Sequence, residues 1–275
     1  MAIQLVGVAL YDRTAGVAGV FNATVSLTGL IGGIGTQPAA GDVVVIVSGW
    51  AHNADGDPGV TGYTEIADLY ANSTYDANLS LAWLVCGSTP PTSFSVNVQS
   101  AAASPSFAIA GVFRGVDNTT PVDVAPVTAT ATGNIVGTLP SVTPVTSGAA
   151  VYTCMVSAAS GTTTAFLNGV PAGYTSLGWT KVAGSSYTVL AGGAVKFNCA
   201  AGVAQAPGAF TAGVGATTGT SRAMATFALR PASGGIKAWN GSAWIAEPVK
   251  HWNGTAWVTK PLKVWNGSAW VRTTY

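Results

Sequence analysis

Short apolar runs separated by turn-forming residues fill the first 230 residues of the chain. The runs are rich in Val, Ile, Thr and aromatic residues, and Gly, Pro, Asn and Asp lie between them. No long stretch has the 3.6-residue apolar spacing of an amphipathic helix, so the pattern predicts an all-β protein. The expected strands are Ile3–Leu10, Ala23–Leu27, Asp42–Ser48, Tyr63–Ile66, Leu79–Cys86, Ser93–Val98, Phe107–Phe113, Ala149–Ser157, Tyr174–Leu177, Ser186–Leu190, Gly193–Cys199 and Ala223–Leu229.

The body of the chain repeats itself. The phrase GVTGYTEI at 59–66 resembles GVPAGYTSL at 169–177. An apolar strand precedes each phrase, and a strand that ends in a cysteine, Cys86 or Cys199, follows it. Each half also closes with an apolar strand that leads to an arginine. These similarities indicate two related halves within one body.

We expect the two halves, at about 1–123 and 134–230, to form one body over residues 1–230. A half of about five strands cannot easily cover both faces of its own sheet. One jelly-roll-like sandwich of two sheets is therefore favoured over two separate domains. The segment from Asp117 to Gly133 is expected to cross between the halves.

The C-terminal residues form a separate block. Residues 231–235 predict a flexible joint, because Pro, Ser and Gly dominate them. Residues 236–275 then repeat the phrase Lys-x-Trp-Asn-Gly-(Ser/Thr)-Ala-Trp-(Val/Ile) three times. The repeats have a period of 13 residues, which is set by Lys237, Lys250 and Lys263.

Each repeat predicts a short β-hairpin, because Asn-Gly between β-formers favours a two-residue type I′ turn. With Asn240-Gly241 as that turn, Trp239 faces Ser242, and Trp244 lies diagonally across on the same face. The expected turn residues are Asn240, Gly241, Asn253, Gly254, Asn266 and Gly267. The tryptophans that would form three indole-rich faces are Trp239, Trp244, Trp252, Trp257, Trp265 and Trp270.

The indole faces need a cover, because a lone hairpin is marginally stable in water. The body, a ligand, or the same C-terminal tail (residues 236–275) of another copy of the chain would each cover them. Packing at a subunit contact is favoured, since aromatic residues are enriched there. Exposed indoles also stack on sugar rings, and three in tandem would bind a glycan multivalently. The six tryptophans are therefore candidates for self-association or glycan contact.

Charge is sparse and unevenly distributed. Charged residues make up 8% of the chain, and the net charge is +1. Residues 1–235 hold six Lys/Arg and nine Asp/Glu, a net −3, and residues 236–275 hold five Lys/Arg and one Glu, a net +4. The whole-chain balance gives no electrostatic case for binding nucleic acid. Polar residues interrupt every apolar stretch, so no membrane insertion is expected, and the first residues do not resemble a signal peptide.

No catalytic, cofactor-binding or metal-binding set emerges from the residue spacing. Asn53, Asp55 and Asp57 would offer oxygen ligands to Ca²⁺, but the rest of an EF-hand is lacking, and a polar loop is the favoured interpretation. An enzyme would have to rely on these two aspartates with Glu65 and Asp68. The three widely spaced cysteines fit neither a disulfide framework nor a zinc site, and they predict buried thiols.

The tail repeats resemble those of tailed-bacteriophage virion proteins, especially minor tail proteins of phages that infect actinobacteria. Three phrases of the body, GDVVV at 41–45, GYTEI at 62–66 and FRGVDNTTPVD at 113–123, are similar to phrases in phage-encoded β-sandwich structural proteins. The resemblance implies assembly with other virion proteins in the host cytoplasm and no catalytic residues. It also implies a homo-oligomer, for which a trimer is one alternative.

These observations together predict a non-enzymatic virion structural protein without a cofactor. A minor tail protein at the tail tip, acting in assembly or host attachment, is the first expectation. A capsid decoration protein is the second. A carbohydrate-binding module for host cell-wall glycan is the third, and it belongs to a different functional class.

Overall fold

The computed structural model describes residues 2–13, 22–97, 104–213, 220–232, 236–239, 244–247, 250–259, 263–265 and 270–272. In the C-terminal segment, side chains are described for residues 250–258. The described residues form antiparallel strands and contain no helix, so the expected all-β class is confirmed. Accordingly, no helix among them has the length and apolar character needed to cross a membrane.

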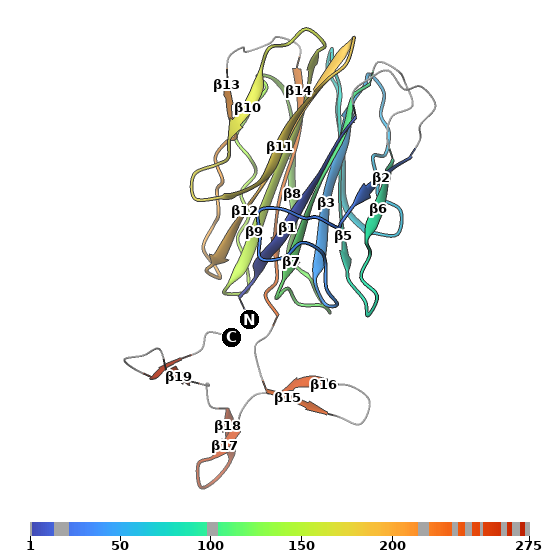
Figure 1. The fold of residues 1–275 in the computed structure, drawn as a ribbon. Helices are drawn as coiled ribbons and strands as arrows, with labels where there is room; N and C mark the ends of the chain where they lie inside the picture. The colour runs from blue at the N-terminus through green and yellow to red at the C-terminus, as the bar shows by residue number, and fades with distance from the viewer. Residues whose placement is uncertain are drawn as a thin grey trace.

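Two five-stranded sheets form the body (Figure 1). The first has the order β1 (Gln4–Arg13), β7 (Ser106–Arg114), β3 (Val43–Ala51), β5 (Ala77–Val85) and β4 (Thr64–Ala71). The second has the order β8 (Val122–Gly133), β14 (Thr220–Leu229), β9 (Ala149–Ser160), β12 (Tyr187–Cys199) and β11 (Thr175–Ala183). Each sheet therefore comes from one continuous half of the chain, and the fold is β-sandwich-like.

The two sheets follow the same path. In each, the first strand of the half lies at one edge, the last strand lies beside it, and the central strand comes third. In each, the fourth strand (β5 or β12) pairs antiparallel with the strand at the other edge (β4 or β11), which directly precedes it in the chain. The sequence similarity between the halves thus accompanies an identical strand order.

The path of the chain differs from the jelly-roll-like connection that we expected. In a jelly roll the chain passes repeatedly between the two sheets, whereas here it completes one sheet before it begins the other. The segment expected to cross between the halves also differs. Its residues 122–133 form β8, which pairs with β14 along the edge of the second sheet.

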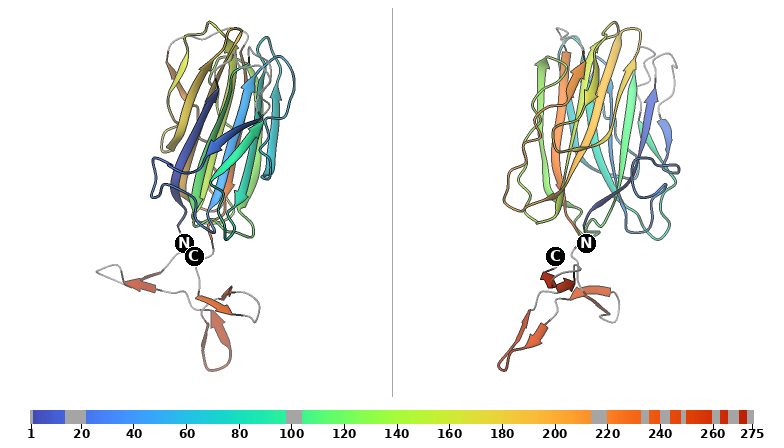
Figure 2. Two further views of the ribbon diagram at one scale, coloured as in Figure 1. Left: turned by 45° about the vertical axis from the view of Figure 1, so that its right-hand side comes forward. Right: turned by 60° about the vertical axis from the view of Figure 1, so that its left-hand side comes forward.

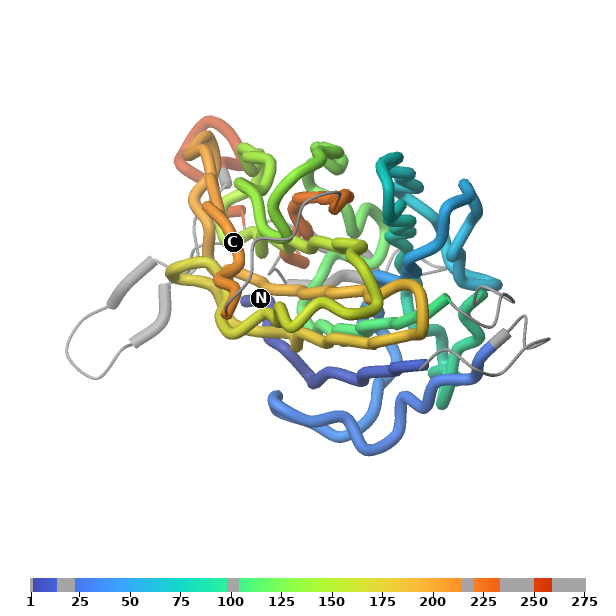
Figure 3. Tube along the Cα trace, turned by 90° about the horizontal axis from the view of Figure 1, so that it is seen from above, coloured from blue at the N-terminus to red at the C-terminus, as the bar shows by residue number. Residues whose placement is uncertain are grey.

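The main core lies between the sheets. Strands β3, β9 and β14 are buried almost throughout, because each has strand neighbours on both sides and side chains packed on both faces. Aromatic rings from both halves meet at the centre, where Tyr152 lies 5.3 Å from Phe227 and 6.3 Å from Phe113 between ring centroids. Views from the side and from above show the two layers (Figures 2 and 3). Burial of this surface joins the halves into one body.

Each half covers the outer face of its own sheet. A two-stranded sheet of β2 (Asn22–Ser26) and β6 (Ser93–Asn97) lies over the first sheet and closes a second apolar cluster with Val44, Ile46 and Val112. Strands β10 (Phe166–Gly169) and β13 (Thr211–Gly213) pair on the second half, where Leu167 and Phe210 cover Met155 and Met224. These covers explain why the central strands lack alternation between polar and apolar residues.

Three further strand pairs follow the body. They are β15 (Ile236–Trp239) with β16 (Trp244–Glu247), β17 (Lys250–Trp252) with β18 (Trp257–Thr259), and β19 (Lys263–Trp265) with β20 (Trp270–Arg272). Strand β1 begins and β14 ends at the same end of the body, and the three pairs lie beyond that end (Figures 1 and 2). The repeats are thus attached at one pole of the sandwich.

Candidate functional site

The strand pair β17–β18 is the repeat whose side chains are described, and its register differs from the expected one. Trp252 lies directly opposite Trp257, not diagonally across from it. Four residues, 253–256, connect the two tryptophans, so Gly254 and Thr255 occupy the centre of the turn instead of Asn253 and Gly254. The difference of one position brings the two indoles into the closest kind of cross-strand pair.

Asn253 organises this turn through its side chain. Its Oδ1 atom accepts hydrogen bonds from the backbone N–H of Thr255 at 2.9 Å and of Ala256 at 2.8 Å, and from the Thr255 hydroxyl at 3.0 Å. The Asn253 N–H donates to the Ala256 carbonyl at 3.1 Å. Gly254 has a φ of 101°, a conformation that glycine adopts at little cost. The Asn-Gly pair therefore shapes the turn, although it does not form the two-residue loop.

Trp252 and Trp257 form an exposed aromatic pair. Their ring centroids are 5.9 Å apart and their planes are inclined by 60°, a geometry favoured between aromatic rings. Trp252 remains 53% exposed and Trp257 67% exposed. Contact between the two rings supports a hairpin that would otherwise be marginal, yet more than half of each residue's surface still faces water. This pair is the strongest candidate for a contact surface.

The other two repeats have an equivalent backbone register. Trp239 is paired with Trp244, and Trp265 with Trp270. The turn residues Asn240, Gly241, Asn266 and Gly267 lie outside the described residues, so their expected role stays a prediction. All three repeats therefore share the backbone register in which the two tryptophans lie directly opposite each other.

Four carboxylates gather at the edge of the first sheet. Asp55 and Asp57 lie in the loop before β4, and Glu65 and Asp68 lie on β4 itself, all four exposed. The Ser80 hydroxyl donates a hydrogen bond to Glu65 Oε2 at 3.0 Å. The expected cluster of acidic residues is therefore close together in space as well as in sequence.

Two of these carboxylates, Glu65 and Asp68, have a raised pKa. The pKa of Asp68 is raised to about 6, first by partial burial and then by the charges of its three acidic neighbours. The pKa of Glu65 is also raised, chiefly by partial burial, with a further contribution from Asp57. Within the part of the chain that the structure describes, no three His, Cys, Asp or Glu side chains are arranged to hold a metal ion. The clustered carboxylates therefore repel one another, but they are not arranged to bind a metal ion.

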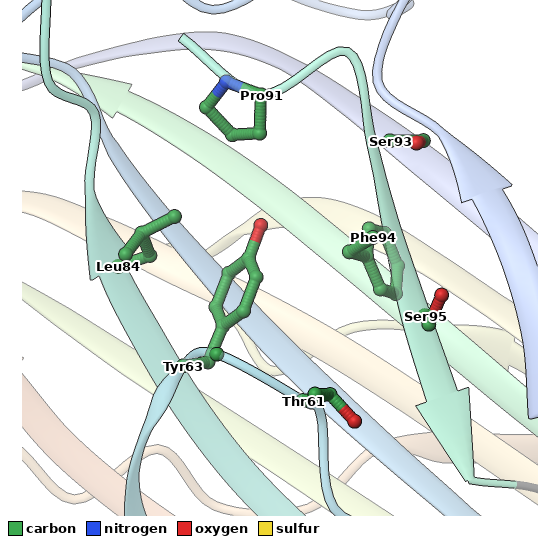
Figure 4. Close-up of a pocket in the computed structure, with 8 residues that line it drawn as sticks. Thr61, Tyr63, Leu84, Pro91, Ser93, Phe94 and Ser95 are labelled. Carbon is green, nitrogen blue, oxygen red and sulfur yellow. The ribbon is translucent and has the colours of Figure 1, made fainter.

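A shallow pocket of about 520 Å³ lies on the outer side of the first half. It lies between the loop that carries Tyr63, the end of β5 at Leu84 and strand β6 at Phe94. The Tyr63 ring stands between Leu84 and Phe94, with its hydroxyl directed toward Pro91 (Figure 4). The Tyr63 and Phe94 ring centroids are 6.2 Å apart at 62°. The pocket walls are thus formed largely by residues that close the outer apolar cluster.

The repeated Tyr and Cys residues have structural roles. Tyr63 lies close to Cys86 in the first half, and Tyr174 lies close to Cys199 in the second. Burial raises the pKa of each tyrosine, and the neighbouring thiol raises it further. All three cysteines are free and buried, as the sequence predicted. Burial raises the pKa of Cys86 to about 11 and that of Cys154 to about 12. Such thiols are poor nucleophiles at neutral pH.

The pocket is the feature that the residue pattern did not identify. Its residues Tyr63 and Phe94 come from a loop and a short strand that are about 30 residues apart in sequence. The repeated Gly-Tyr-Thr phrase marked Tyr63, but nothing in the sequence pairs it with Phe94. The contact exists because β6 folds over the outer face of the first sheet.

The chain matches no family model, no curated protein and no solved structure. The function proposed below therefore rests on the residues, their arrangement and the resemblance of the C-terminal repeats.

Proposed function

We propose that this chain is a non-enzymatic structural protein of a tailed-phage virion. Its place would be the tail tip, as a minor tail protein that acts in assembly or host attachment. The main support for this proposal is the C-terminal segment of the chain, residues 236–275. Its three Trp-containing repeats pair in the same register beyond one end of the body. Such a phrase is what resembles the C-terminal repeats of phage minor tail proteins.

In this proposal the body and the tail have different tasks. The body is a β-sandwich with a continuous apolar core between its sheets, which suits a stably folded building block of a particle. The tail is a set of three short Trp-rich hairpins that makes contacts. Its attachment at one end of the body leaves the rest of the body's surface for other contacts. A homo-oligomer is expected, together with other virion proteins as neighbours.

The placement can be tested by immunogold labelling of intact particles. The antibody should be raised against residues 1–230, so that it does not depend on the tail. Gold at the tail tip is the expected result. Gold over the head would instead support a capsid decoration protein, in which the tail makes lattice contacts. A chain that is clearly expressed but labels no particle would remove the virion proposal.

The oligomeric state can be tested on the purified chain. Sedimentation equilibrium of the full chain should give a mass above that of one 27.4 kDa chain. A chain that ends at Arg230 keeps the whole sandwich and separates the contributions of body and tail. Retention of the oligomer in that shorter chain is expected if the body carries the contact. A monomer would place the contact in the tail.

A further inference from the structure

The central repeat presents a cation beside its indole pair. Lys250 is paired with Thr259, two positions along β17 from Trp252. Because side chains two residues apart point to the same face of a strand, Lys250 and Trp252 share a face with Trp257. All three residues are exposed. Two exposed indole rings and a positive charge are therefore available together to one ligand.

The same residue types recur at the same backbone positions in the other two repeats. Lys237 and Lys263 occupy the backbone positions that correspond to Lys250, two before Trp239 and Trp265. Two residues join Glu247 to Lys250, and a fully extended chain spans at most about 3.6 Å per residue. The bases of the first two hairpins thus lie within about 11 Å of each other. A single polymer could contact successive repeats.

Charge argues against mutual cover by tails. Residues 236–275 carry five cations and one glutamate, so two tails packed face to face would bring like charges together. The body does not provide an alternative at the central repeat, where Trp252 and Trp257 are more than half exposed. An anionic partner with apolar ring faces fits both properties of the surface.

We propose that the tail repeats bind a polymeric glycan that carries negative charges. In the central repeat, the C–H faces of a sugar ring would pack against Trp252 and Trp257, and a carboxylate or phosphate of the polymer would contact Lys250. The two equivalent repeats would bind further along the same polymer. Linked weak sites of this kind can gain ~10²–10⁴-fold in avidity without any new contact.

The proposal is tested by affinity electrophoresis of the full chain through gels that contain one polymer each. Polygalacturonic acid supplies a carboxylate glycan, and purified wall teichoic acid supplies a phosphate-containing one. Dextran supplies neutral sugar, and polyglutamate supplies negative charge without sugar. Retardation by either anionic glycan, with little retardation by dextran or polyglutamate, is the expected result. The anionic glycan that binds more strongly identifies the charged group.

Matched variants separate stacking from charge. The double variant Trp252→Ala/Trp257→Ala should weaken retardation roughly 10-fold, because it removes one of three linked sites. The corresponding phenylalanine variant should retain part of the binding. Lys250→Gln should weaken binding at low salt and have less effect at high salt, where charge is screened. Trp179→Ala is the control, because Trp179 is a 41% exposed tryptophan of the body.

Several results would overturn the proposal. Equal retardation by polyglutamate would show that charge alone acts, and equal loss in the Trp179 control would show a general effect of tryptophan removal. A fall in the mass of the Trp252/Trp257 variant, with glycan binding unchanged, would assign the indoles to self-association. The test uses the purified chain. Its failure therefore leaves the labelling of particles untouched, and an unlabelled particle leaves the binding result untouched.

Discussion

The guanidinium of Arg114 holds the carboxylate of Asp42 through two hydrogen bonds of 2.9 Å. Arg114 ends β7, and Asp42 directly precedes β3, so the pair fastens the loop before the central strand to the last strand of the half. The Asp42 side chain is 1% exposed. In the second half Arg230 contacts Asp123 through a single 3.3 Å pair, and Asp123 also accepts two backbone N–H bonds from the loop before β9. Each half thus ends in an arginine that pairs with a buried aspartate, on the loop before β3 in the first half and on β8 in the second.

Removal of Arg114 should destabilise the body more than removal of Arg230. Arg114→Met removes both charged donors from the buried Asp42 carboxylate and leaves it the single backbone N–H of Ala39, which should cost about 1–3 kcal/mol in the free energy of unfolding. Arg230→Met should cost about 1 kcal/mol or less, because two backbone donors remain on Asp123. Urea unfolding of both variants measures the difference. Equal losses would contradict the assigned roles.

The acidic edge should make stability depend on pH. The pKa of Asp68 is about 6, against an ordinary value of 3.8, so the folded chain binds a proton more tightly than the unfolded one. Stability from this group is therefore present below about pH 4 and is lost as the pH rises through about 6. Asp68→Asn should raise the melting temperature at pH 7.5 and change it little at pH 3.5.

A matched aspartate controls for the loss of charge as such. Asp12 lies exposed on β1, in the opposite edge strand of the first sheet. Asp12→Asn should change the melting temperature much less than Asp68→Asn at pH 7.5. High salt should reduce the effect of Asp68→Asn, since exposed charges are screened. A benefit that is independent of pH would point to a cause other than ionisation.

Two glycines should differ in how much stability they lose when replaced by alanine. A Cβ atom at Gly49, on β3, would overlap the backbone carbonyl of Asn78 on the neighbouring strand. Gly49→Ala should therefore cost about 1–3 kcal/mol or more, because two strands would have to separate. Nothing lies within 4 Å of a Cβ atom at Gly87, so Gly87→Ala should stay within about 1 kcal/mol of the parent. Denaturant unfolding compares the two.

The turn of the central repeat should depend on the Asn253 acceptor. Asn253→Ala removes the oxygen that accepts two backbone N–H bonds and the Thr255 hydroxyl. A loss of about 1 kcal/mol would be enough to open a two-stranded hairpin. Exciton-coupled circular dichroism between the indoles should fall in this variant. Asn253→Asp retains the acceptor and should keep most of the signal.

The three thiols should not react with thiol reagents in the folded chain. Cys86, Cys154 and Cys199 are buried, and burial raises the pKa of each. A disulfide exchange reagent should therefore label none of them at neutral pH and all of them after denaturation. Labelling of one cysteine in the native chain would identify a region of local opening.

Strand existence followed from the sequence more readily than strand extent. Two strands were expected on either side of Gly192, but β12 continues through it. A Cβ atom at Gly192 would lie 2.8 Å from the Phe210 ring, so the glycine makes room for the outer apolar cluster and does not end the strand. Strand β8 escaped prediction because Pro126 interrupts it. There the register shifts, and the edge position tolerates a residue without an N–H.

The candidate surface was predictable in composition but not in geometry. The sequence shows the six tryptophans, the three lysines and the 13-residue period directly. The pairing of Trp252 directly with Trp257 was not, because it depends on the Asn253 side chain replacing a backbone acceptor in the turn. The side-chain hydrogen bonds within the turn set that register, and a residue pattern does not show them.

The sequence by itself determined the all-β class, the relation between the halves and the separate cationic tail. These follow from local properties, namely β-propensity, turn chemistry and repetition along the chain. Only the tertiary structure decided that each half completes its own five-stranded sheet. The same holds for the closing arginines, which reach buried aspartates distant in sequence. Those choices depend on which apolar faces meet, and contacts between residues far apart in the chain set that free energy.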